Sequence, residues 1–138
     1  MDRIRDKKIL IVEDSQSVQV ELQELFTRLG MKVVGVASNG VEAIKLVSEL
    51  EPDLVSLDII MPEMDGIECY RHLRQSDPER PFLFFVTALA TEARVVSEYA
   101  EEIDPSLYMP KPLTERGFLE KIGKIYLSDA DIEEKELF

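Results

Sequence analysis

Short apolar runs alternate with amphipathic segments along most of the chain, in the pattern typical of alternating strands and helices. The apolar runs have the length of buried strands and cover residues 8–12, 32–37, 53–58, 81–87 and 107–109. Apolar residues recur at helical spacing within residues 18–29, 43–50, 67–73, 93–103 and 118–126. The alternation predicts an α/β fold, a doubly wound five-stranded parallel sheet with helices on both faces.

Turn-forming and capping residues mark the ends of these segments. Ser15 and Thr114 each precede a helical pattern and are predicted N-caps, whereas Gly30 is a predicted helix stop. Asp65 and Gly66 are interpreted as residues of a turn rather than as catalytic groups. The expected connections between strands and helices are therefore short, as a compact α/β domain requires.

Composition narrows the class of protein. The 138 residues suit one domain, because a chain of this size buries roughly 68% of its unfolded surface without disulfides. A net charge of −12 argues against direct binding to nucleic acid or to an anionic membrane. The run Phe82–Val86 is far shorter than the roughly 18 residues of a spanning helix, and a single cysteine, Cys69, excludes an internal disulfide. We expect a cytoplasmic protein with no membrane partner.

Charged and hydroxyl side chains follow the predicted strands at the point where each strand ends. Glu13 and Asp14 follow the first strand, Asp58 the third, Thr87 the fourth and Lys111 the fifth. Ligands bind at this edge of an open parallel sheet. Three carboxylates facing one ammonium predict a divalent cation, and a set of oxygen ligands favours Mg²⁺, with Mn²⁺ as the alternative. A carboxylate placed there could attack a phosphoryl donor and become an aspartyl phosphate.

The motifs Glu13-Asp14, Asp58, Thr87-Ala88 and Lys111-Pro112, with 61–66 reading Met-Pro-Glu-Met-Asp-Gly, occur in this order at the strand ends. In this the chain resembles the response-regulator receiver domains of two-component signalling, of the chemotaxis-regulator type. The resemblance implies a flavodoxin-like fold with strand order 2-1-3-4-5. It also implies a receiver domain over residues 1–127, with an acidic tail or linker remnant over 128–138.

Carried over residue by residue, the resemblance implies that Asp58 accepts a phosphoryl group from a sensor histidine kinase or a histidine phosphotransfer protein. It implies that Asp14 binds Mg²⁺ directly and Glu13 largely through water, with Asp58 and the backbone carbonyl of Ile60 as further ligands. Lys111 would pair with the phosphoryl group. The expected function is a signalling switch rather than a dedicated enzyme, since the protein would catalyse only its own phosphorylation and slow dephosphorylation.

The same resemblance predicts a switch in which Thr87 hydrogen-bonds the phosphoryl group and Tyr108 turns inward behind it, although Tyr108 could equally be an ordinary core aromatic. The output surface would be built from the fourth helix, fifth strand and fifth helix and would bind a downstream protein or a second copy of the chain. Ile60 and Leu89 replace the polar residues that fast-resetting family members tend to carry. We therefore expect slow self-dephosphorylation, because neither side chain can orient a water molecule.

Two alternatives remain open from the sequence. The preferred function is a stand-alone regulator, and the first alternative is a receiver fragment of a larger regulator. The second is an aspartate-nucleophile phosphatase on a similar fold, a family that needs a second acid two residues after the nucleophile. This chain has Ile60 at that position, which disfavours the phosphatase.

Overall fold

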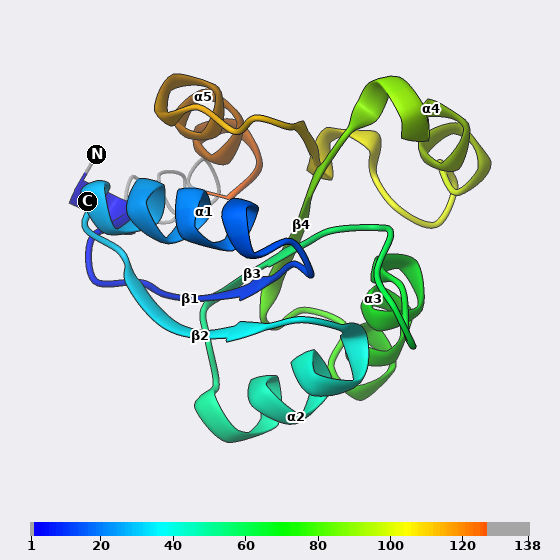
Figure 1. Ribbon diagram of the computed structural model, residues 1–138, viewed down its shortest axis with the longest axis horizontal. Helices are drawn as coiled ribbons and strands as arrows, with labels where there is room; N and C mark the ends of the chain where they lie inside the picture. Colours follow the sequence, from blue (N-terminus) through cyan, green and yellow to red (C-terminus); the bar gives the residue numbers. More distant parts are fainter. Residues whose placement is uncertain (1, 127–138) are drawn as a thin grey trace, which may run out of the picture.

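A computed structural model of the chain describes residues 2–126 and shows a central sheet with helices on both faces (Figure 1). All strand pairings are parallel, and the five strands lie in the order β2-β1-β3-β4-β5, which confirms the predicted fold. The strands are β1 Lys8–Val12, β2 Lys32–Ala37, β3 Leu54–Leu57, β4 Phe82–Thr87 and β5 Tyr108–Pro110. The predicted acidic tail, residues 128–138, lies outside the described residues.

An α-helix follows each strand, and the two faces of the sheet carry different numbers of α-helices. They are α1 Gln16–Arg28, α2 Gly40–Leu50, α3 Gly66–Ser76, α4 Leu89–Glu98 and α5 Glu115–Ile125, with short 3₁₀ helices η1 Asp2–Ile4 and η2 Pro105–Leu107. Figure 1 shows α1 and α5 on one face of the sheet and α2 and α3 on the other. Residues of α4 pack with the core on the α2 and α3 side. Within residues 2–126, no helix is both long and apolar enough to cross a membrane.

The alternation of side chains along β1, an interior strand of the sheet, explains the two cores. Ile9 and Ile11 of β1 face α1 and α5, whereas Leu10 and Val12 face α2 and α3. All four are buried, as expected for a strand covered on both faces. Burial of this strand fixes its register, so the residues that follow Val12 have a defined position at the edge of the sheet.

The structure differs from the sequence prediction around the fourth helix and fifth strand. The helix ends at Glu98 rather than at Ile103, because the chain turns at Tyr99, whose carbonyl accepts the Ile103 amide at 2.8 Å. The turn carries Ile103 into the core, where it is fully buried. The predicted Leu107 lies in η2, and β5 begins one residue later.

The capping predictions are confirmed for Thr114, whose hydroxyl accepts the Gly117 amide at 3.0 Å. Ser15 also occupies the N-cap of α1, but its side chain makes no capping hydrogen bond. Its backbone amide instead donates to the Glu13 carboxylate at 3.0 Å. The first turn of α1 is therefore joined to the end of β1 through an acidic side chain.

Candidate functional site

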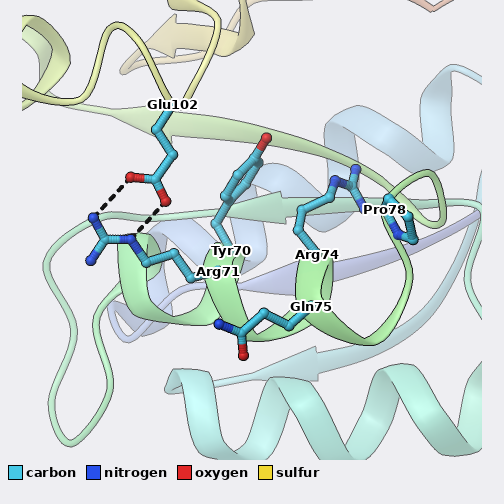
Figure 2. Close-up of a pocket in the computed structure, with 6 residues that line it drawn as sticks. All are labelled: Tyr70, Arg71, Arg74, Gln75, Pro78 and Glu102. Carbon is cyan, nitrogen blue, oxygen red and sulfur yellow. Dashed lines mark hydrogen bonds and ion pairs between the residues drawn. The ribbon is translucent and has the colours of Figure 1, made fainter.

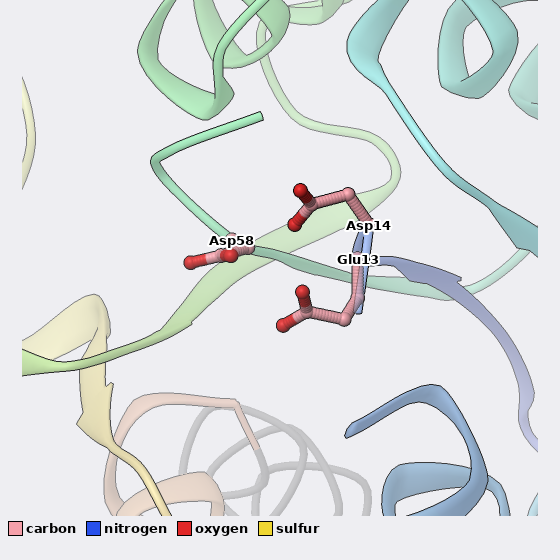
Figure 3. Close-up of side chains that lie close together, drawn as sticks. All are labelled: Glu13, Asp14 and Asp58. Atoms are coloured by element: carbon pink, nitrogen blue, oxygen red, sulfur yellow. The ribbon is translucent and has the colours of Figure 1, made fainter. Parts of the chain in front are cut away.

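Three carboxylates meet at the carboxyl ends of β1 and β3 (Figure 3). Glu13 and Asp14 follow β1, and Asp58 follows β3; one carboxylate oxygen of each lies within 4.8 Å of those of the other two. Glu13 and Asp58 are 2% and 6% exposed, whereas Asp14 is exposed. Because β1 and β3 pair in parallel, with Val12 opposite Leu57, their ends deliver these acids side by side.

Lys111 is the basic partner of this cluster. Its ammonium Nζ lies 2.7 Å from Glu13 Oε1 and 3.2 Å from Asp58 Oδ2. Burial would lower the pKa of Lys111, but the hydrogen bond to Glu13 and the charge of Asp58 raise it above its ordinary value. Burial raises the pKa of Glu13, against the hydrogen bond from Lys111. Lys111 therefore carries a full positive charge at neutral pH.

The donor set fits a hard divalent cation. One ammonium faces three carboxylates, so negative charge remains uncompensated in a partly buried place. Oxygen ligands converging from two adjacent strand ends, with one acid open to water, match the preference of Mg²⁺ for carboxylates and retained waters. The predicted acidic residues thus come together as expected from the sequence.

The loop after Asp58 is held by its own backbone. The Ile59 amide donates to Asp58 Oδ1 at 2.9 Å, and the Gly66 amide donates to the Ile59 carbonyl at 2.8 Å. A Cβ at Gly66 would overlap the main-chain carbonyl of Asp58. Asp65 caps α3 by accepting the Glu68 amide at 2.9 Å, consistent with its interpretation as a turn residue. Gly66 is therefore required by the close approach of two backbone segments.

Ile60 and Leu89 lie on segments next to the acidic cluster. Ile60 is two residues after Asp58, and its side chain is 66% exposed. Leu89 is the first residue of α4, two residues after Thr87. The metal-binding role of the Ile60 carbonyl stays a prediction, as does the effect of both residues on dephosphorylation.

Thr87 and Tyr108 are buried with unpaired hydroxyls. Thr87 ends β4 and is fully buried, and Tyr108 begins β5 and is 2% exposed. Neither Thr87 Oγ1 nor the Tyr108 hydroxyl has a hydrogen-bond partner among residues 2–126. The Tyr108 ring stacks on Phe85, with centroids 4.9 Å apart. Tyr108 thus already points inward in this structure, and both hydroxyls are free to accept or donate a new hydrogen bond.

A salt bridge joins Arg71 of α3 to Glu102 in the segment between α4 and β5 (Figure 2). Arg71 of α3 donates two hydrogen bonds to Glu102, at 2.7 and 2.8 Å, and its guanidinium lies 5.0 Å from the centroid of the Tyr99 ring. Beside this pair, a shallow hollow of about 510 Å³ is lined by Tyr70, Arg71, Arg74, Gln75, Pro78 and Glu102. Sequence reasoning missed the Arg71–Glu102 pair, because its members are 31 positions apart and belong to no motif.

Comparison with known proteins gives a consistent result. The family model described as "Response regulator receiver domain" matches residues 9–123. The chain is 32% identical over 119 residues to the chemotaxis protein CheY of Thermotoga maritima, covering 86% of this chain and 97% of that protein. It is 39% identical over 106 residues to a protein-glutamate methylesterase/protein-glutamine glutaminase of Nocardioides, but there the match covers only 29% of that protein.

A solved structure shows the same arrangement of elements. The chain is 29% identical, with a TM-score of 0.74, to a chain in the crystal structure of the CheX-CheY-BeF3-Mg complex from Borrelia burgdorferi. The alignment covers 91% of this chain and 92% of that one. The likeness therefore extends over nearly the whole chain.

Proposed function

The chain belongs to the response regulator receiver domain family, and we propose that Asp58 is its phosphoacceptor and that a histidine kinase or phosphotransfer protein is its donor. The observation that carries this proposal is the convergence of Glu13, Asp14 and Asp58 with the Lys111 ammonium at one edge of the sheet. Asp58 is buried, its Oδ1 accepts the Ile59 amide, and its Oδ2 lies 3.2 Å from the Lys111 ammonium.

The chemistry follows from these positions. One carboxylate oxygen of Asp58 attacks the phosphorus atom of a phosphohistidine. The bond from phosphorus to the imidazole nitrogen breaks, its electron pair goes to that nitrogen, and the nitrogen takes up a proton. Lys111 donates to an oxygen of the transferred group, and the Thr87 hydroxyl is free to donate to another. Mg²⁺ held by Glu13, Asp14, Asp58 and the Ile60 carbonyl would add positive charge beside the same oxygens.

The solved relative from Borrelia supports the cofactor, since its complex is named as containing both BeF₃ and Mg²⁺. The acidic cluster here offers three carboxylate ligands at the corresponding edge of the same fold. An apolar hollow of about 190 Å³ lies beside Lys111 and is lined in part by Val18, Leu22 and Leu113. It gives a donor protein an apolar contact surface next to the acceptor.

We further propose that residues 1–127 form the switch unit and that this unit acts as a stand-alone regulator. The match to the Thermotoga protein supports this, because it covers 97% of that protein. Phosphorylation would bias the surface of α4, β5 and α5 toward a downstream protein or a second copy of the chain. The unpaired hydroxyls of Thr87 and Tyr108 on β4 and β5 support this route, because a phosphoryl group offers Thr87 a strong acceptor.

The proposal is tested by incubating the protein with acetyl phosphate and Mg²⁺ and measuring the intact mass. The wild type is expected to gain the mass of one phosphoryl group, and Asp58→Asn is expected to gain none. Asp65→Asn is the matched control on the same loop, because asparagine also caps a helix. A mass gain in Asp58→Asn, or none in the wild type, would overturn the assignment.

A further inference from the structure

Gln19 makes a hydrogen bond to the backbone next to Asp14. Its side-chain Nε2 donates to the Glu13 main-chain carbonyl at 2.6 Å. A carbonyl can only accept, so the amide group of Gln19 must present its NH₂ to it. This carbonyl belongs to the peptide that joins Glu13 to Asp14, and Gln19 lies in the second turn of α1. A helix side chain thus reaches back to the end of β1.

The other polar groups of Glu13 are held by different partners. Its amide donates to Ala37 of β2 at 2.9 Å, and its carboxylate accepts from Ser15 and Lys111. Each contact fixes either the strand end or the Glu13 side chain. The hydrogen bond from Gln19 is the one that fixes the orientation of the peptide leading to Asp14.

Asp14 itself has little else to hold it. Its carboxylate is exposed, and the structure gives it no hydrogen bond to any of residues 2–126. Glu13 and Asp58 are by contrast buried and paired with Lys111. The direction of the Asp14 side chain therefore depends on its backbone, and that backbone depends on Gln19.

We propose that Gln19 is a positioning residue for the metal: it presets Asp14 so that the exposed carboxylate meets the two buried ones around Mg²⁺. This inference rests on the proposed function, because it assumes that the acidic cluster binds the metal. Groups that orient a ligand through hydrogen bonds change metal affinity by about 10- to 100-fold when removed. Gln19 contacts neither the acceptor oxygen nor Lys111, so its removal should weaken binding without changing the chemistry once metal saturates the site.

The experiment compares Gln19→Met, which keeps the length but removes the donor, with Gln19→Asn, which stays polar but is one methylene too short. Gln16→Met is the matched control, since Gln16 is an exposed residue of the same helix whose side chain makes no hydrogen bond to residues 2–126. Metal affinity is measured from the electron paramagnetic resonance of free Mn²⁺ during titration. The rate of phosphorylation by acetyl phosphate is measured over a range of Mg²⁺ concentrations.

Both Gln19 variants are expected to need about tenfold more metal for half-saturation, with a phosphorylation rate at saturating Mg²⁺ close to that of wild type. Gln16→Met should match wild type in both measurements. Unchanged half-saturation in the Gln19 variants would overturn the inference, and so would a lowered saturated rate with unchanged metal affinity, which marks a merely structural role. If Gln19→Met does not fold, Gln19→Asn decides alone.

Asp14→Asn separates failure of this inference from failure of the proposed function. If wild type binds no Mn²⁺, or if Asp14→Asn binds it as tightly as wild type, the metal site itself is wrong and the inference falls with it. If Asp14→Asn loses binding but both Gln19 variants bind like wild type, only the role of Gln19 is wrong.

Discussion

Lys111 lies nearer to Glu13 than to Asp58: its Nζ is 2.7 Å from Glu13 Oε1 and 3.2 Å from Asp58 Oδ2. Before phosphorylation, the ammonium therefore mainly compensates the more buried acid and leaves one oxygen of Asp58, Oδ1, to the Ile59 amide. A phosphoryl group on Asp58 would have to draw Lys111 away from Glu13. The carboxylates of the cluster therefore repel one another when neither metal nor phosphoryl group is bound.

This repulsion predicts that Asp58→Asn raises the free energy of unfolding in EDTA by about 1 kcal/mol. One of three neighbouring carboxylates is removed, while the ion pair of Lys111 with Glu13 remains. The measurement is urea unfolding followed by circular dichroism. Added Mg²⁺ should stabilise wild type more than the variant. An unfolding midpoint below that of wild type in EDTA would show that Asp58 is well compensated as it stands.

Replacing Gly66 by alanine should be severely destabilising, because the new Cβ would overlap the Asp58 carbonyl and two backbone segments would have to separate. We expect a loss of about 3 kcal/mol in the free energy of unfolding. Gly123→Ala, within α5, is the control and should gain roughly 0.5 kcal/mol from helix propensity. Equal stability of the two variants would contradict the close approach at Gly66.

Removing the buried hydroxyl of Ser56 on β3 or of Thr87 on β4 should change stability in the same way but should affect signalling differently. Ser56 of β3 is 1% exposed and, like Thr87, has no hydrogen-bond partner among the described residues. Ser56→Ala and Thr87→Val should each raise the free energy of unfolding by about 1 kcal/mol, since a buried unpaired hydroxyl is costly.

Only Thr87→Val should uncouple phosphorylation from the output surface, because only Thr87 lies at the strand end beside the acidic cluster. Hydrogen exchange of residues 94–110, with and without acetyl phosphate, would test this. Exchange in Ser56→Ala should change on phosphorylation as in wild type. A preserved response in Thr87→Val would remove Thr87 from the switch.

Tyr108 should make the fold sensitive to alkali. Burial, with smaller effects of the charges of Tyr70, Glu102 and Tyr99, raises the pKa of Tyr108 above 10.0. The unfolded chain loses this proton first, so the stabilising effect of protonated Tyr108 is complete below about pH 10 and is lost as pH rises through the folded pKa. Urea unfolding from about pH 8 to 11 should show a steeper fall for wild type than for Tyr108→Phe. Parallel curves would place Tyr108 in a wetter environment than its burial indicates.

The lifetime of the phosphorylated form should be set in part by Ile60. Its exposed side chain lies two residues after the acceptor and cannot orient an attacking water molecule. Ile60→Asn should shorten the lifetime, by at least about tenfold if the amide positions water as a polar catalytic group does. Loss of the phosphoryl mass over time gives the rate, and Ile60→Leu should remain slow. A half-life of seconds in wild type would contradict the predicted role.

Sequence patterns predicted the elements whose signals are local. The apolar run before Asp58 and the acids after Val12 each mark a strand end within a few residues, and parallel topology then brings them together. The end of α4 could not be predicted in this way, because Ile103 continues the helical spacing although the chain has already turned at Tyr99. Contacts between distant side chains, such as Gln19 with Glu13, depend on the final packing and leave no pattern in the sequence.

Strand order has a consequence for signalling fidelity. The acidic cluster, Thr87 and Lys111 are carried by the ends of β1, β3, β4 and β5, and these strands lie side by side only when the sheet is complete. A chain with β5 unpaired would lack the Lys111 ammonium beside Asp58. If Asp58 is the phosphoacceptor, as proposed, such a chain would lack the cation that pairs with the transferred group. Phosphorylation would then require that β5 is paired with β4.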